Sequence, residues 1–296
     1  MIEYKVLSRK YRPKKLKEVI GQDFTVRTLT NAFAQEKLAH AFLFTGIRGV
    51  GKTTTARLVA MSLNGAENPT TDYDLKSESV TDIIDGKSMD VIEIDGASNR
   101  GIDEIRELRE NIKFMPVSGK FKVIIIDEVH MLTVQAFNAL LKTLEEPPQH
   151  VKFILATADV HKVPQTIISR CQRFDFLPLS NSTICDRLKF IAKSENQSID
   201  EKSLSLIAGK SEGSMRDALS YLDQVLVLGD DIASDTVQEL LGVVPHEILF
   251  SISDALHDKD GDKLMANLEI IRNKGYIVED LLKDLILHFR NLSVMD

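Results

Sequence analysis

The stretch that decides the fold is residues 41–55, Ala41-Phe42-Leu43-Phe44-Thr45-Gly46-Ile47-Arg48-Gly49-Val50-Gly51-Lys52-Thr53-Thr54-Thr55. An apolar run that predicts a strand leads into a glycine loop, and the loop leads into a segment, 54–63, that predicts a helix. Residues 46–53 fit G-x-x-x-x-G-K-[ST], the pattern of a phosphate-binding loop. Glycines let successive backbone N–H groups turn toward a phosphate, and the helix adds the positive end of its dipole. The stretch therefore predicts a site for a nucleoside triphosphate.

Two side chains of this loop have separate predicted roles. Lys52 reaches the β- and γ-phosphates, and the Thr53 hydroxyl holds Mg²⁺. The alternative is a chance glycine turn, which the strand before the loop and the helix after it disfavour. The residues expected to contact the nucleotide here are Gly46, Ile47, Arg48, Gly49, Val50, Gly51, Lys52, Thr53 and Thr54.

The composition limits the class of protein. The chain has 296 residues, of which 43% are hydrophobic and 27% charged, so we expect a soluble globular protein of two or three domains. No apolar run approaches the ~20 residues that span a bilayer, and the N-terminus lacks a signal peptide's apolar core. Cys171 and Cys185 show no disulfide or metal-ligand pattern. These features predict a cytoplasmic protein with no membrane partner. The net charge of -7 disfavours coating of nucleic acid by bulk electrostatics, so DNA contact needs a local patch or an assembly.

A second motif follows the apolar run at 121–126, which is typical of a central parallel strand. The run ends at Asp127-Glu128-Val129-His130. Carboxylates at the carboxyl end of such a strand lie where α/β folds bind ligands. Together with the upstream phosphate loop, they predict that Asp127 helps to hold Mg²⁺ and that Glu128 orients and deprotonates the attacking water. We interpret His130 as a packed or surface histidine.

Strands and helices alternate through the first part of the chain, which predicts a parallel sheet covered on both faces. The residues at 8–16 are basic and extended around Arg12, and composition alone favours a solvated tail. The polar, acidic insertion at 64–90 predicts a loop with one short helix. Strands are predicted at 42–44, 91–94, 121–126, 151–156 and 173–176, and helices at 24–38, 102–112 and 133–144, the last capped by Thr133.

From residue 178 onward the pattern is helical only. The final helix has no closing signal, because its apolar pattern is still running at Met295-Asp296, and we expect the chain to be a fragment. The predicted helices are 182–193, 202–208, 214–228, 246–256, 262–273 and 277–294.

Seven stretches together form a specific set: Tyr11-Arg12-Pro13, Gly21-Gln22, 46–53, 126–132, 137–148, Ile168-Ser169-Arg170-Cys171 and 213–219. This set resembles the bacterial DNA polymerase III gamma/tau subunits, the ATP-hydrolysing motors of the replicative clamp loader in the AAA+ class. The resemblance covers nearly the whole chain.

The resemblance implies a fold and an activity. The expected fold is an α/β P-loop NTPase (AAA+) domain at 1–177, whose parallel sheet is flanked by helices. A small helical lid domain at 178–242 and the start of a helical collar, or oligomerisation, domain at 243–296 follow. The implied activity is ATP hydrolysis, with ATP and Mg²⁺ as cofactors, within the DNA polymerase III holoenzyme, a DNA-directed DNA polymerase complex classed as a nucleotidyltransferase. The implied partners are delta-type and delta-prime-type subunits, further copies of the chain, the sliding clamp and primed DNA.

The resemblance also implies roles for single residues. Arg170 resembles the arginine finger that reaches the γ-phosphate bound by a neighbouring subunit, whereas most lone arginines are surface charges. Arg216 resembles the sensor arginine of the second domain, and a cation in a helix's first turn opposes the dipole, which favours a functional reason. Thr157 resembles the sensor threonine, although the next position, often polar, is Ala158. The residues that resemble the adenine and ribose contacts, in place of a solvated tail, are Tyr11, Arg12, Pro13, Val19 and Ile20.

The chain departs from the family in the insertion. The family carries four zinc-binding cysteines there, but the matching positions in this chain are Gly65, Asp74, Ser77 and Val80. Structural zinc sites need thiolates or imidazoles, and 64–90 contains neither Cys nor His, so we predict no zinc.

Two other functions remain as alternatives. A helicase or Holliday-junction motor would separate or move DNA strands, but the sequence offers no dedicated DNA-binding element. A nucleotide-locked scaffold would bind other subunits without hydrolysing ATP, and the complete Lys52-Thr53 and Asp127-Glu128 motifs disfavour it.

Overall fold

The computed structural model describes residues 5–229 and 234–295. The chain divides into two compact units. Unit 1 takes in Met1–Thr183 and Gly213–Arg216, and unit 2 takes in Ile184–Glu212 and Asp217–Asp296. The boundaries between the units fall inside two helices, because α8 (Asn181–Ser194) and α10 (Met215–Leu226) each begin in unit 1 and continue in unit 2.

Unit 1 is built on a five-stranded parallel sheet in the order β2-β3-β4-β1-β5. Because all strands run the same way, their carboxyl ends share one edge. In register, Thr45 pairs with Thr157, and Asp95 pairs with Asp127. This edge is where open α/β sheets bind ligands. The strands are β1 (Ala41–Thr45), β2 (Val91–Asp95), β3 (Lys122–Asp127), β4 (Val151–Thr157) and β5 (Gln172–Asp175).

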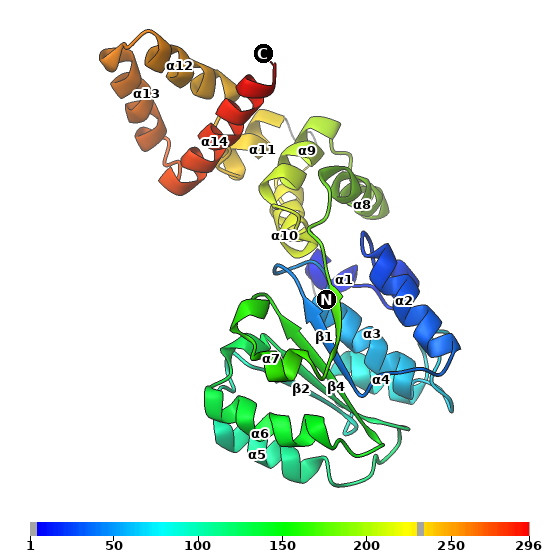
Figure 1. Ribbon diagram of the computed structural model, residues 1–296. Helices are drawn as coiled ribbons and strands as arrows, with labels where there is room; N and C mark the ends of the chain where they lie inside the picture. The colour runs from blue at the N-terminus through cyan, green and yellow to red at the C-terminus, as the bar shows by residue number, and fades with distance from the viewer. Residues whose placement is uncertain (1–4, 230–233, 296) are drawn as a thin grey trace. The chain divides into compact units, whose positions relative to one another are not determined.

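Two hydrophobic clusters cover the two faces of this sheet. Successive strand residues point to opposite faces, so Phe42 and Phe44 join the cluster with α2, α3 and α4, while Ala41 and Leu43 join the cluster with α5, α6 and α7. Figure 1 shows these helices on either side of the sheet. The helices are α1 (Leu7–Lys10), α2 (Asp23–Ala34), α3 (Lys52–Asn64), α4 (Glu78–Asp85), α5 (Ile102–Asn111), α6 (Val134–Glu145) and α7 (Gln165–Ile168), with 3₁₀ turns η1 (Leu16–Glu18), η2 (Val129–Met131) and η3 (Val160–Lys162).

The described residues of unit 2 form helices and connecting loops, with no strand. α11 packs against α9, and α12 packs against both α13 and α14 over a small core that includes Val244 and Leu249. Two ion pairs join the end of α9 to α14: Lys210 to Asp280 at 2.6 Å and Lys283 to Glu212 at 2.7 Å. Besides α8 and α10, the helices are α9 (Glu201–Lys210), α11 (Ser234–Leu240), α12 (His246–His257), α13 (Gly261–Asn273) and α14 (Val278–Met295).

The predicted fold class is confirmed, with local differences. Residues 8–10 were expected to be extended, but they belong to α1, and the non-helical backbone begins after Tyr11. The insertion contains one short helix, α4, as expected, and the Thr133 side chain accepts a hydrogen bond from the Ala136 N–H at 3.2 Å, as an N-cap should. None of the helices in the described parts of the chain has the length and apolar character needed to cross a membrane.

Candidate nucleotide site

The glycine loop joins β1 to α3, and its conformation depends on glycine at two positions. Gly51 precedes the first residue of α3 with φ 104°, a left-handed value that side chains disfavour. Gly49 has φ 80°, and an added Cβ there would lie 2.0 Å from the Ser214 hydroxyl oxygen. Gly51 therefore lets the backbone of the loop turn inward, as a phosphate cradle requires. Gly49 lets the loop approach the start of α10 closely.

Lys52 is the buried cation of this loop, with only 5% of its surface exposed. Its ammonium group donates to the carbonyl oxygens of Gly46 at 2.7 Å and Ile47 at 2.9 Å. Burial lowers the pKa of Lys52 and is only partly offset by the nearby carboxylates of Glu128 and Asp127. An ammonium has three donors, so one remains for a phosphate, whose charge would favour the protonated lysine.

Thr53 and Asp127 supply two oxygens at one point, where α3 begins and β3 ends. The Thr53 hydroxyl donates to Asp127 Oδ2 at 2.5 Å, and the Glu128 N–H donates to the other carboxylate oxygen at 2.9 Å. A hydroxyl and a carboxylate are ligands that suit Mg²⁺, which binds oxygen and keeps part of its water shell. These residues fit the predicted metal.

Glu128 and Thr157 lie at the ends of neighbouring strands and share a neighbour, His130. Glu128 has φ 46°, an unusual value for a residue with a side chain, of the kind that occurs at functional sites. His130 Nδ1 lies 3.4 Å from Glu128 Oε2 and 3.0 Å from the Thr157 hydroxyl. The Thr157 hydroxyl donates to the Asp159 carbonyl and accepts from the Asp159 N–H, both at 3.0 Å. The Ala158 N–H donates to Glu128 Oε2 at 3.3 Å.

His130 was interpreted from the sequence as a packed or surface histidine, with no functional role. A hydroxyl has one proton, so if Thr157 donates it to the Asp159 carbonyl, His130 Nδ1 is the donor in its contact with Thr157. The histidine thus links the two strand ends. The only sequence signal was its place directly after Asp127-Glu128-Val129.

Cationic side chains gather near the loop. The pKa of Arg12 is lowered by burial and then by the positive charges of Arg57 and Arg216. The positive charge of Arg216 also lowers the pKa of Lys52. The Arg216 backbone N–H donates to the Gly49 carbonyl at 3.4 Å. Arg57 is paired with Glu93 through two hydrogen bonds of 2.7 and 2.8 Å. Several positive side chains close to one loop favour the binding of a polyanion, and a triphosphate is a polyanion of suitable charge.

The family follows from two comparisons. Residues 21–180 match the family model described as DNA polymerase III, delta subunit, and residues 183–231 match that of the DNA polymerase III clamp loader subunit, ATPase lid domain. The chain is 43% identical over 292 residues to DNA polymerase III subunit tau of Bacillus subtilis, covering 98% of this chain and 52% of that protein. It is 42% identical to DNA polymerase III subunit gamma of Buchnera aphidicola (strain APS), covering 99% and 81%.

The chain belongs to the DNA polymerase III gamma/tau family of clamp-loader ATPase subunits. It spans about half the length of the Bacillus subtilis relative and 44% of that of Escherichia coli subunit tau, to which it is 40% identical over 96% of this chain. Among solved structures, Thermotoga maritima RuvB, titled a Holliday junction branch migration motor, matches with a TM-score of 0.58 and 20% identity, over 83% of this chain and 80% of that one. A likeness at this identity shows the fold alone.

The expected adenine and ribose contacts come from a different part of unit 1. Tyr11 and Pro13 are half-buried on either side of Arg12, while Val19 is buried in the cluster under α3 and Ile20 is half-buried. Within the loop, Ile47 and Arg48 are exposed, Val50 is buried, and Thr54 is half-buried in α3. The charge of Arg216, which helps to lower the pKa of Arg12, connects this segment to the start of α10.

Arg170 lies away from the loop of its own chain. It comes two residues before β5, whose Gln172 pairs with Phe42 near the amino end of β1, whereas the loop leaves the carboxyl end of β1. Its guanidinium donates to Glu145 at 2.7 Å and to the Thr166 carbonyl at 2.8 Å, and 34% of the side chain is exposed. The structure thus brings Lys52, Thr53, Asp127, Glu128, Thr157 and Arg216 together, and Arg170 apart from them.

The four positions that the resemblance matched to zinc ligands offer no thiolate or imidazole in this chain. An added Cβ at Gly65 would lie 2.8 Å from Val80, which is fully buried, and 3.0 Å from Tyr73. The Ser77 hydroxyl donates to the Asp74 carbonyl at 2.9 Å. Thiolates or imidazoles would be needed, and apolar packing takes their place.

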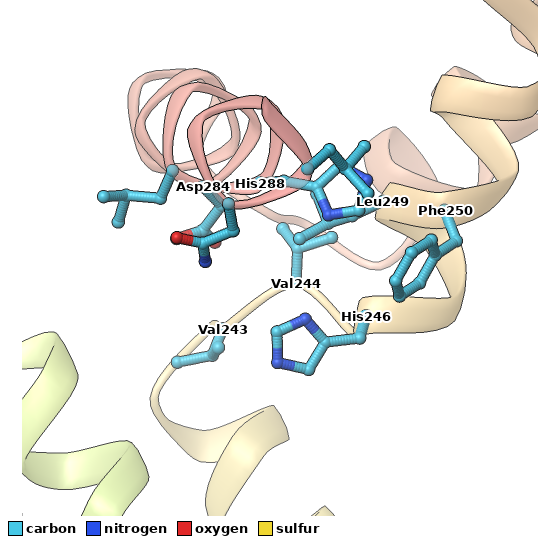
Figure 2. Close-up of a pocket in the computed structure, with 10 residues that line it drawn as sticks. Val243, Val244, His246, Leu249, Phe250, Asp284 and His288 are labelled. Carbon is cyan, nitrogen blue, oxygen red and sulfur yellow. The ribbon is translucent and has the colours of Figure 1, made fainter. Parts of the chain in front are cut away.

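A cavity of about 540 Å³ in unit 2 has a different character (Figure 2). The Val244 side chain points toward α14, where His288 packs edge-on against Phe250 and lies 3.2 Å from the Ser253 hydroxyl. Its lining offers no glycine loop, lysine or arginine, so it is a poor match for a phosphate. The lining residues are Val243, Val244, His246, Leu249, Phe250, Asp284, Leu287, His288, Asn291 and Leu292.

Proposed function

We propose that this chain binds ATP with Mg²⁺ in the loop at 46–54 and hydrolyses it as the motor subunit of a bacterial clamp loader. In this function ATP binding draws subunits around an open sliding clamp on primed DNA, and hydrolysis releases the clamp. The observation that carries the proposal is the meeting of buried Lys52, the Thr53–Asp127 pair and Glu128 at one edge of the sheet. These are the parts that phosphoryl transfer to water needs.

Each side chain has one step in the proposed reaction. Lys52 donates its third N–H to a phosphate oxygen and stabilises the charge that builds up during transfer. Thr53 and Asp127 hold Mg²⁺, which would neutralise phosphate charge when bound. Glu128 takes the proton of the attacking water. Thr157 and His130 hold the Glu128 carboxylate in position through the contacts at 3.0 and 3.4 Å.

Two arginines complete the proposed site from different directions. Arg216, whose backbone contacts Gly49, contacts the γ-phosphate in the same chain. Arg170 acts on the nucleotide of a neighbouring subunit, because it lies toward the opposite edge of its own sheet. The proposed adenine and ribose contacts are Tyr11, Arg12, Pro13, Val19 and Ile20.

The proposed partners are those of a clamp loader. They are delta-type and delta-prime-type subunits, further copies of this chain, the sliding clamp and primed DNA. The chain would act within the cytoplasmic DNA polymerase III holoenzyme and supply ATP hydrolysis, with nucleotidyl transfer belonging to the polymerase. We propose 1–177 as the nucleotide-binding domain, 178–242 as the lid and 243–296 as part of the collar.

An exposed apolar patch supports a protein partner for unit 1. Met89, Phe114, Met115 and Val117 are 67–75% exposed. They are adjacent because the Asp90 carboxylate accepts hydrogen bonds from the backbone of Val117 and its two successors at 2.7–2.8 Å. Four large apolar side chains exposed on neighbouring segments suit a surface that a partner covers.

ATP turnover tests the proposal. The chain is reconstituted with delta-type and delta-prime-type subunits, and hydrolysis is measured alone, with the sliding clamp, and with clamp plus primed DNA. We expect slow turnover alone and the fastest turnover with both. Binding without turnover under every condition would favour the scaffold function, and strand separation by the purified chain would favour a helicase or junction motor.

A further inference from the structure

The insertion after α3 is tied to the segment that precedes η1. The Tyr73 hydroxyl donates to the Lys14 carbonyl at 2.8 Å, although 59 residues separate them. Tyr73 is 3% exposed, and its ring belongs to the same cluster as Leu16, Val19 and Val80. The ring is therefore fixed by packing, so its hydroxyl has a defined position from which to hold Lys14.

Further contacts support this connection. Lys15 pairs with Asp72 at 2.8 Å and lies 6.0 Å from the centre of the Tyr73 ring. The Lys14 N–H donates to Glu18 Oε2 at 2.8 Å. Both backbone polar groups of Lys14 are thus held by side chains, in a stretch where the backbone, outside regular structure, cannot satisfy them itself.

The Tyr73 hydroxyl remains a donor over the physiological pH range. Burial, and then the negative charge of Glu18, raise the pKa of the Tyr73 phenol above its ordinary value. A protonated phenol can donate, whereas a phenolate would repel the Lys14 carbonyl oxygen. The phenol therefore keeps the proton that it donates to Lys14 at neutral pH.

We propose that Tyr73 is a positioning residue for nucleotide binding, which fixes Lys14 and thereby the Tyr11-Arg12-Pro13 segment against adenine and ribose. The inference rests on the proposed function, in which that segment contacts the base. Lys14 is three residues from Tyr11, a span of at most about 10 Å. The insertion, whose apolar packing replaces a metal, would thus affect recognition of the base and ribose and leave phosphate binding unchanged.

The test compares a ligand that has a base with one that lacks it. Tyr73→Phe removes only the hydroxyl, and affinities for ATP and for inorganic tripolyphosphate are measured by calorimetry with Mg²⁺ present. We expect ATP affinity to fall about three- to tenfold, the effect of losing one hydrogen bond that orders a segment. Tripolyphosphate affinity should not change. Tyr276→Phe, which removes a half-exposed hydroxyl in unit 2, is the matched control and should change neither.

Trypsin cleavage after Lys14, Lys15 and Lys17 in the nucleotide-free protein gives a second measurement. We expect Tyr73→Phe to be cut there several times faster than wild type. Unchanged cleavage would overturn the connection itself, and faster cleavage with unchanged ATP affinity would overturn its role in binding. Equal losses for ATP and tripolyphosphate would indicate general destabilisation and overturn the inference. If wild type bound neither ligand, the proposed function would fail as well.

Discussion

The Thr53 hydroxyl donates to the Asp127 carboxylate at 2.5 Å, although 74 residues separate the two in the chain. Thr53 is in the first turn of α3, and Asp127 is the last residue of β3. In the sheet order, β4 lies between β3 and β1, so Thr157 at the end of β4 lies between the strand that carries Asp127 and the strand that enters the loop. The strand order therefore assembles the site from three separate motifs.

Glu128→Gln should separate nucleotide binding from hydrolysis. The amide keeps the size of the side chain but cannot accept the proton of water, so we expect ATP affinity within about twofold of wild type. General-base catalysis contributes about 10²–10⁴-fold, and the single-turnover rate should fall by that amount. Quenched-flow measurement of ATP cleavage in the reconstituted assembly gives the rate. A normal rate would remove Glu128 from the mechanism.

Thr157→Val should slow hydrolysis more than it weakens ATP binding. The substitution removes the hydroxyl that contacts His130 and the Asp159 backbone, so Glu128 loses part of its support. We expect kcat to fall about tenfold or more with a small change in KM, the loss of about 1.4 kcal/mol of transition-state stabilisation. Thr55→Val is the control, because the buried Thr55 hydroxyl has no hydrogen-bond partner and its loss should leave kcat unchanged. A matched effect at both positions would indicate a general loss of stability.

Arg170→Ala should bind ATP normally and stop turnover in the assembly. An arginine supplied by a neighbour contributes about 10³–10⁵ in rate in comparable systems. A mixing experiment tests the direction: Lys52→Ala subunits keep Arg170, and Arg170→Ala subunits keep a working loop. We expect each preparation to be inactive alone and the mixture to regain turnover. Arg173→Ala, which removes an exposed arginine paired with Asp175, should behave as wild type. Failure of the mixture would place Arg170 in its own site or outside the mechanism.

The sheet and the phosphate loop were predictable because their signals are local. Apolar runs of strand length and the G-x-x-x-x-G-K-[ST] spacing need no knowledge of distant residues, and the strand and helix bounds differ by few residues from those predicted. The contacts of His130 and Tyr73 were not predictable. Each joins segments far apart in sequence, His130 to Thr157 and Tyr73 to Lys14, through geometry that only the folded chain creates. The short helix α11 was not predicted from the sequence, because its seven residues show too little periodicity to identify a helix.

Asp90→Asn should destabilise unit 1 in a pH-dependent way. Burial raises the pKa of Asp90, but hydrogen bonds from the backbone of Val117, Gly119 and Ser118 outweigh this, so the pKa lies below its ordinary value. A carboxylate of this kind stabilises the folded state above its unfolded pKa of about 4, and the contribution is lost as the pH falls through the folded pKa.

Urea unfolding at several pH values measures this effect. We expect Asp90→Asn to cost about 1–3 kcal/mol at pH 7, because an amide cannot accept from all three N–H groups. The difference from wild type should shrink below about pH 4. Asp85→Asn, a change at an exposed position on α4, is the control and should stay within about 0.5 kcal/mol at each pH. A difference that did not depend on pH would show that the charge of Asp90 is not the cause.

Removal of divalent metal should leave the insertion folded. The family positions are occupied here by Gly65, Asp74, Ser77 and Val80, and the contact of Gly65 with Val80 and Tyr73 replaces metal–thiolate bonds with apolar packing. A structural zinc supplies folding free energy directly, so its removal would lower the melting temperature. We expect nucleotide-free protein to melt at the same temperature with and without EDTA and to contain no stoichiometric zinc by elemental analysis. Val80→Ala should lower the melting temperature instead, because it leaves a cavity in this packing at a cost of about 1–3 kcal/mol. A lower melting temperature in EDTA would show that this chain holds a structural divalent metal.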